Sequence, residues 1–268
     1  MNLLKSSFAG SFYSNNSNVL NSQLAEFFKK TKKVMVHPKA LLVPHAGYVY
    51  SGLTAAHAYR QLENENYKTA IILGPSHQVY SDSLSIPNEN AYATPLGTIL
   101  FDEQLKEKLI KTGNFKLDSA PHYQEHSLEV QLPFLKYMCP NIKILPLSVG
   151  NIDTKNYKAC GQILAENMTP ETLLIISTDL SHFHSLNIAK SLDQKTIETI
   201  LNMDATALLQ AYHNKTIECC GIFPIILGLT ALSFFSNLKA EVLYYDTSAS
   251  SSFDDERVVG YVAMGFSS

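Results

Sequence analysis

The sequence predicts a single α/β domain in which helices flank a central mixed, largely parallel sheet. Three short apolar runs support this prediction: Ala40–Val43, Ala70–Leu73 and Leu173–Ile176. Apolar runs of this length, bounded by glycine, proline or small polar residues, are typical of strands buried on both faces of a parallel sheet. Strand-like and helix-like segments alternate along all 268 residues without a repeat or a linker, so residues 1–268 are predicted to fold as one domain.

The other elements of the first half follow from capping residues and apolar spacing. We expect a helix over Val19–Lys30, a helix near Ser51–Leu62 with Ser51 as its N-cap, a pair of short strands or an excursion within Leu84–Leu100, where proline and glycine interrupt the pattern, and a helix over Asp102–Thr112 capped by Asp102.

In the second half, the spacing of Leu128, Leu132 and Leu135 predicts one helix over Glu125–Tyr137. The remaining expected elements are a strand over Ile142–Val149, helices over Lys155–Asn167, Ala189–Asn202 and Asp204–His213, a core helix within Cys219–Phe235, and strands over Ala240–Tyr245 and Val258–Phe266 separated by a loop at Ser248–Ser252.

Composition narrows the function classes. The net charge of -3 gives no sign of a nucleic-acid or anionic-membrane partner. The N-terminus lacks the features of a signal peptide, and glycine and proline break the longest apolar run, Cys219–Phe235, so no membrane span is expected. The four cysteines form neither a CxxC pair nor a disulfide framework. A reducing cytoplasm is therefore the expected location.

Histidines follow the ends of the predicted buried strands. His45 and His77 each come shortly after an apolar run and a proline, and Asp179 and His182 follow the third run. Ligands of open α/β sheets gather at the carboxyl ends of the strands, so these side chains are expected to share one site. Imidazole suits iron, copper and zinc, and the site would be completed by Asp179, His182 or Cys220.

His126 lies at the start of the helix predicted from Glu125. It could act as a base or as a partner of a metal ligand, but a histidine in a capping turn explains the same position equally well. Several common chemistries have no motif in the sequence, which contains no GxGxxG, Walker loop, GxSxG elbow or HExxH pair.

Blocks of sequence along nearly the whole chain resemble one known family. They are Ala9-Gly10-Ser11-Phe12-Tyr13, Val43-Pro44-His45-Ala46-Gly47-Tyr48, Gly74-Pro75-Ser76-His77, Glu125-His126-Ser127-Leu128-Glu129, Ser177-Thr178-Asp179-Leu180-Ser181-His182-Phe183, Cys220-Gly221 with Pro224-Ile225, and Val259-Gly260-Tyr261. In this order they identify the chain as a member of the MEMO family, whose bacterial and archaeal members are also called AmmeMemoRadiSam system protein B.

The resemblance implies a fold similar to class III extradiol dioxygenases, which hold non-haem iron(II). By motif, the metal ligands would be His45, His77 and Cys220, and His126, Asp179 and His182 would line the same pocket as catalytic residues. The implied cofactor is iron(II) or copper. Cys219 is a second thiol beside the expected ligand, so either cysteine could serve.

Three readings of function follow. The first is a metal-dependent redox protein, similar to a dioxygenase. The second is a non-enzymatic protein whose pocket binds a small molecule or a peptide, or which assembles with AMMECR-type and radical SAM proteins, as the family's name implies. The third is zinc-assisted hydrolysis. Phe183 and Ile222-Phe223-Pro224 depart from the animal family member and weaken any transfer of its phosphopeptide binding.

Overall fold

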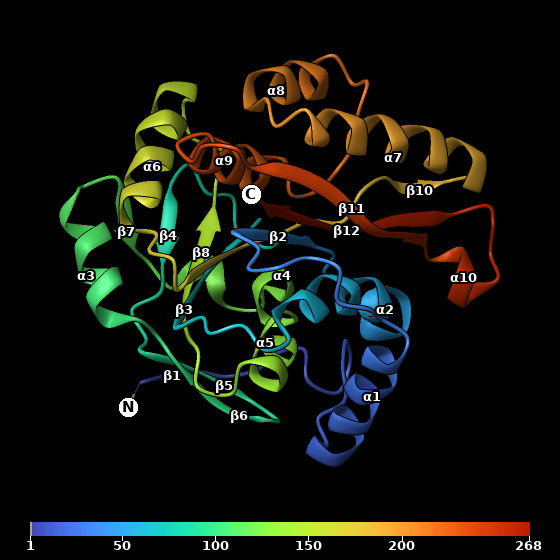
Figure 1. The fold of residues 1–268 in the computed structure, drawn as a ribbon, viewed down its shortest axis with the longest axis horizontal. Coiled ribbons are helices and arrows are strands. Elements are labelled where there is room, and N and C mark those ends of the chain that lie inside the picture. Colours follow the sequence, from blue (N-terminus) through green and yellow to red (C-terminus); the bar gives the residue numbers. More distant parts are fainter. Residues whose placement is uncertain (1) are drawn as a thin grey trace.

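The computed structural model describes residues 2–268 and has three layers, with helices on both faces of a nine-stranded mixed sheet (Figure 1). Across the sheet the strands are β10 (His182–His184), β12 (Val258–Ser267), β2 (Ala40–Val43), β9 (Thr172–Ser177), β3 (Thr69–Gly74), β8 (Lys143–Val149), β4 (Leu84–Ile86) and β7 (Phe115–Leu117), and β11 (Lys239–Thr247) also pairs with β12. A separate small sheet contains β1 (Leu3–Leu4), β5 (Ala91–Thr94) and β6 (Gly97–Leu100).

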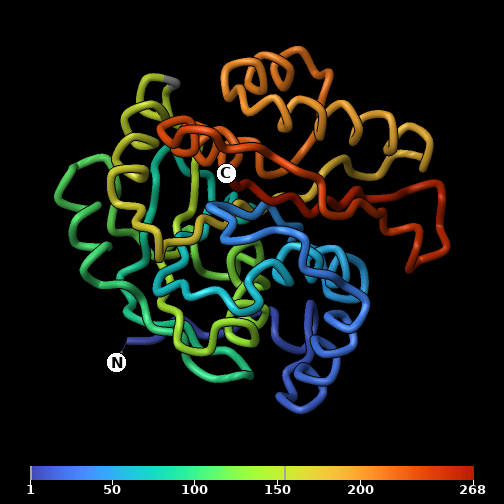
Figure 2. Tube along the Cα trace, in the orientation of Figure 1, coloured from blue at the N-terminus to red at the C-terminus, as the bar shows by residue number. Residues whose placement is uncertain are grey.

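The centre of the large sheet is parallel, as expected. Strands β2, β9, β3 and β8 run in the same direction, whereas β12 and β4 join them in antiparallel orientation. In Figure 2 the red C-terminal strand, β12, lies beside the blue β2, with which it pairs in antiparallel orientation. The predicted fold class, a mixed and largely parallel sheet flanked by helices, is therefore confirmed.

Alternate residues of the central strands point into two separate cores. Leu42 and Ile176 face one core, and Leu41 and Ile175 face the other. The first core is covered by α3 (Glu103–Lys111), α6 (Thr154–Asn167), α7 (Leu186–Leu201), α8 (Ala205–His213) and α9 (Ile222–Leu232). The second core is covered by α1 (Ser17–Lys29), α2 (Tyr48–Tyr59), α4 (His126–Glu129) and α5 (Leu132–Met138).

Two predicted helices differ from the structure. The helix expected over Glu125–Tyr137 is two helices, α4 and α5, because Pro133 has no N–H to donate to the carbonyl of Glu129. Ser51 is not an N-cap: α2 begins at Tyr48, and the Ser51 hydroxyl instead donates to the Ala46 carbonyl.

Several short elements were not predicted. The segment Leu84–Leu100 contains three strands rather than a pair. No strand was predicted at the positions of β1, β7 and β10. The loop expected at Ser248–Ser252 contains a single helical turn, α10 (Ala249–Ser252). Two 3-10 turns, Arg60–Leu62 and Ala120–His122, complete the structure. No helix within residues 2–268 has both the length and the apolar character needed to cross a bilayer.

Candidate metal centre

The predicted site residues leave neighbouring strands at the same edge of the sheet. Strand β9 pairs with β2 on one side and with β3 on the other, all in parallel. His45 follows the end of β2, His77 follows the end of β3, and Asp179 follows the end of β9. The structure thus brings these segments together at the edge where parallel α/β sheets usually bind ligands.

Three histidines come together at this edge. One ring nitrogen from each of His45, His77 and His126 lies within 4.8 Å of the other two, a spacing that could hold a metal ion. His45 is buried, His126 is half-buried and His77 is exposed. Because imidazole is a common ligand for iron, copper and zinc, the chemistry of the group fits a transition metal.

A hydrogen-bond network fixes the protonation pattern of the His45 ring. The Ser177 hydroxyl donates to the Ser127 carbonyl at 2.7 Å, so its oxygen must accept from His45 Nδ1, which lies 2.8 Å away. Nδ1 therefore carries the proton, and Nε2 bears the unprotonated lone pair. Burial, and next the nearby His77, lower the pKa of His45 well below its ordinary value, so the ring is neutral as a ligand must be.

His77 is oriented by the buried carboxylate of Glu125. Glu125 Oε1 lies 2.9 Å from His77 Nδ1, and Oε2 accepts the His77 backbone N–H at 2.5 Å. Burial opposes ionisation of this carboxyl group, but its hydrogen bonds to the His77 ring and to the N–H groups of His77 and Ser127 outweigh burial and lower its pKa to about 2. A carboxylate on Nδ1 leaves Nε2 of His77 available and raises the basicity of the ring.

His126 is held by ring contacts instead of hydrogen bonds. Its ring stacks on His77 with centroids 4.6 Å apart, and Phe12 and Phe8 lie at 4.8 and 5.4 Å. Glu125 Oε1 lies 3.5 Å from His126 Nδ1, which is close enough for an ion pair but too long for a good hydrogen bond. Burial, and then His45, lower the pKa of His126 to about 4.

Cys220 contacts this group through His45. Its thiol lies 3.1 Å from His45 Nε2, and its sulfur accepts the Asp179 backbone N–H at 3.2 Å. Burial, and next the Asp179 carboxylate, raise the pKa of the Cys220 thiol well above its ordinary value. The neighbouring Cys219 is buried, and burial raises its pKa to about 12. Of the two thiols, the Cys220 thiol is therefore the one beside the histidines.

The three predicted catalytic residues line one pocket of about 400 Å³ beside the histidines. They are His126, Asp179 and His182. Asp179 Oδ1 accepts the backbone N–H of His45 at 2.7 Å, and burial raises the pKa of this carboxyl group. The predicted grouping of these three residues in one pocket is thus seen in the structure, while their chemical roles remain predictions.

Comparison with known proteins assigns the family. The family model described as "Memo-like protein" matches residues 5–265. The chain belongs to this family. A MEMO1 family protein of Aquifex aeolicus is 34% identical over 260 residues, covering 96% of this chain and 97% of the relative. A MEMO1 family protein of Methanobrevibacter smithii is 37% identical over 232 residues, covering 85% and 82%.

A solved structure shares a more distant likeness with this Memo-like chain. It is an uncharacterized protein of Escherichia coli K12, with a TM-score of 0.43 and 13% identity, covering 84% of this chain and 98% of the other. A likeness this low informs neither the fold nor the function.

Sequence reasoning missed three residues of the site. Ser177 and Glu125, which orient His45 and His77, were quoted only within motifs, and Arg257 was not singled out. Arg257 lines the pocket with its guanidinium 5.2 Å from the ring centroid of Phe183. The position of Glu125 directly before His126 was the only available signal for any of them, because the other contacts join distant parts of the chain.

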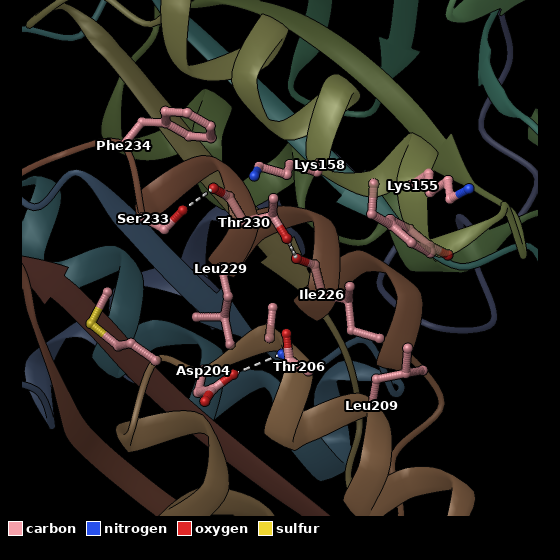
Figure 3. A pocket seen from close by; sticks show the side chains of 13 residues that line it. Lys155, Lys158, Asp204, Thr206, Leu209, Ile226, Leu229, Thr230, Ser233 and Phe234 are labelled. Atoms are coloured by element: carbon pink, nitrogen blue, oxygen red, sulfur yellow. Dashed lines mark hydrogen bonds between the residues drawn. The ribbon is translucent and has the colours of Figure 1, made fainter.

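A larger cavity of about 680 Å³ lies elsewhere, between α6, α8 and α9 (Figure 3). Its polar groups are mostly committed to neighbouring backbone. Asp204 caps α8, the Thr230 hydroxyl donates to the Ile226 carbonyl, and the Ser233 hydroxyl donates to the Thr230 carbonyl. Its lining includes no histidine or cysteine. The cavity beside the three histidines is therefore the better candidate for chemistry, although it is the smaller of the two.

Proposed function

We propose that this Memo-like protein is a metal-dependent redox protein that binds iron or copper at the three-histidine group. His45 and His77 would hold the metal with Cys220 as the third ligand, and His126 lies near enough to join them. The observation that carries the proposal is the pair of hydrogen bonds on the Nδ1 atoms of His45 and His77, which leave an unprotonated lone pair on each Nε2.

The donor set favours a transition metal over calcium or magnesium. Imidazole and thiol are softer ligands than the oxygen atoms that calcium and magnesium prefer. Once bound, iron or copper would supply a one-electron couple and a coordination position for oxygen or a substrate atom. The same ligands also suit zinc, and zinc in the purified protein would favour metal-assisted hydrolysis instead.

The pocket residues would then act on what enters it. His126 and His182, both half-buried, line the pocket and are placed to hold or move a proton there. Asp179 positions the His45 backbone through its Oδ1. The aromatic residues Phe12 and Tyr261 line the same pocket.

Metal analysis tests the proposal. Protein purified without oxygen should contain close to one equivalent of iron or copper, and His45→Ala, His77→Ala and Cys220→Ser should each lose it. The exposed His213 on α8 provides the matched control, because His213→Ala should keep the metal. Circular dichroism of each variant separates metal loss from unfolding. A wild-type protein that binds neither iron nor copper under any loading condition would overturn the proposal.

A second candidate function has its own observation. Phe183 is 62% exposed at the pocket rim and lies under Arg257, so the rim offers an aromatic surface and a cation together. A binding protein that recognises a peptide, a small molecule or a partner of the AMMECR or radical SAM type could use this rim. Arg257→Ala should then abolish partner capture without changing metal content, whereas metal-dependent turnover without any partner would exclude a purely binding role.

A further inference from the structure

The N-terminal segment Ser7–Tyr13, here called the strap, donates several hydrogen bonds to one carboxylate. Glu129 accepts the backbone N–H of Ser7 at 2.8 Å and of Phe8 at 2.9 Å, and the hydroxyl of Tyr13 at 2.6 Å. The Tyr92 hydroxyl adds a fourth donor at 3.3 Å. Three of these four donors belong to the strap, which is more than 100 residues away in the sequence.

Glu129 is unsuited to any role at the surface. Its relative exposure is 0%, and burial raises its pKa although four donors favour the ionised form. A buried carboxylate is tolerated only where hydrogen bonds satisfy its oxygens. The Glu129 donors are all neutral N–H and O–H groups, and no lysine, arginine or histidine forms an ion pair with it within residues 2–268. The carboxylate therefore fixes the position of a chain segment.

The strap in turn forms the wall against which His126 rests. Phe12 and Phe8 place their rings 4.8 and 5.4 Å from the His126 ring, and Phe12 also lines the pocket. The strap folds into a tight turn in which the Phe12 N–H bonds to the Phe8 carbonyl and Gly10 adopts a φ of 96°, a conformation that suits glycine. This turn directs both phenylalanines to the same side.

We propose that Glu129 is a positioning residue of the metal site: it clamps the strap, and the strap fixes the ring of His126 against His77. The inference rests on the proposed function for its purpose, since it explains how the third histidine is oriented. His45 and His77 each have a hydrogen-bond partner on Nδ1, whereas His126 depends on its ring contacts. His126 and Glu129 belong to the same short helix, α4. This helix therefore carries both the histidine and the carboxylate that fixes the strap beside it.

Metal-free protein provides the test, so that failure of the metal proposal and failure of the clamp can be told apart. Glu129→Gln presents an amide NH₂ to a cluster of donors, and Tyr13→Phe removes only one donor should the first variant fold poorly. Tyr92→Phe is the matched control, because its bond is the longest and Tyr92 lies outside the strap. The readouts are hydrogen exchange of the Ser7 and Phe8 amides and the side-chain NMR signals of the nine histidines.

Removing a partner from buried donors should speed amide exchange in the strap of Glu129→Gln by about tenfold or more. Tyr13→Phe should show a smaller increase and Tyr92→Phe almost none. The His126 ring signals, assigned by their loss in His126→Asn, should shift in the first two variants while those of His45 and His77 stay in place. Unchanged exchange and unchanged His126 signals in both variants would overturn the proposal, as would equal shifts of all three histidines.

Discussion

Glu125 and Glu129 occupy the two ends of the same helical turn, and both are buried, yet their surroundings differ. Glu125 bonds to the His77 ring and to two backbone N–H groups, and its pKa falls to about 2. Glu129 receives only neutral donors, and burial raises its pKa. The difference indicates two separate roles, in which Glu125 orients His77 directly and Glu129 holds the strap beside His126.

Replacing Glu125 should have the largest effect. Glu125→Gln removes the carboxylate that orients His77 and replaces one of its two accepting oxygens by an amide NH₂, which then faces a backbone N–H. Loss of such a partner should weaken metal binding by ~10–100-fold. Competition with a chelator of known affinity measures the change. An affinity equal to that of the wild type would refute this separation of roles, because Glu125 would then play no part in orienting a ligand.

Ser177→Ala should have the next largest effect. The Ser177 oxygen accepts from His45 Nδ1 and from the Gln131 amide, so its loss leaves buried donors without a partner. The free energy of unfolding should fall by about 1–3 kcal/mol, with weaker metal binding. Ser148→Ala is the control, since the buried Ser148 hydroxyl has no hydrogen-bond partner. If denaturant unfolding finds the two variants equally stable, the Ser177 network is not needed for the fold.

Tyr13→Phe tests the role of Glu129, because it removes one of the hydrogen bonds that this carboxylate accepts. The 2.6 Å bond from its hydroxyl is buried, so unfolding free energy should fall by about 1 kcal/mol. Metal affinity should change less than in Glu125→Gln, because the effect reaches the site only through the strap. A loss of affinity as large as that of Glu125→Gln would contradict the separation of roles.

The smallest expected effect is on the pH dependence of stability, compared between the wild type and Glu129→Gln. The pKa of Glu129 is raised in the folded protein above the value of about 4.3 found for an unfolded glutamate. The folded state therefore binds this proton more tightly. Relative to Glu129→Gln, wild-type stability should be greatest below pH ~4 and should decline as pH rises through the folded-state pKa. Denaturant unfolding across this range measures the difference, and the opposite slope would show that the donors outweigh burial.

Much of the fold could be predicted from local patterns. The buried strands β2, β3 and β9 are continuous apolar runs, and their parallel pairing places His45, His77 and Asp179 together. Short edge strands such as β10 could not be predicted, because three residues carry no periodicity and their pairing with β12 depends on residues more than 70 positions away.

The start of α2 and the clamp on the strap show a second limit. Ser51 has the composition of a cap, but α2 begins earlier because the Tyr48 N–H bonds to the Phe12 carbonyl, a partner in the strap. The role of Glu129 was equally hidden, since all of its strap partners lie more than 110 residues away. Motif matching could identify these blocks, but it could not show that they meet.

Electron paramagnetic resonance of the copper(II)-loaded protein tests the central claim most directly. The account predicts a spectrum with nitrogen couplings from bound imidazole, altered in His45→Ala and in His77→Ala and unchanged in His213→Ala. The spectrum should also change in Cys220→Ser, which removes the proposed third ligand. A wild-type spectrum equal to that of free copper(II), or one that is identical in His45→Ala and His77→Ala, would contradict a metal centre at the three histidines.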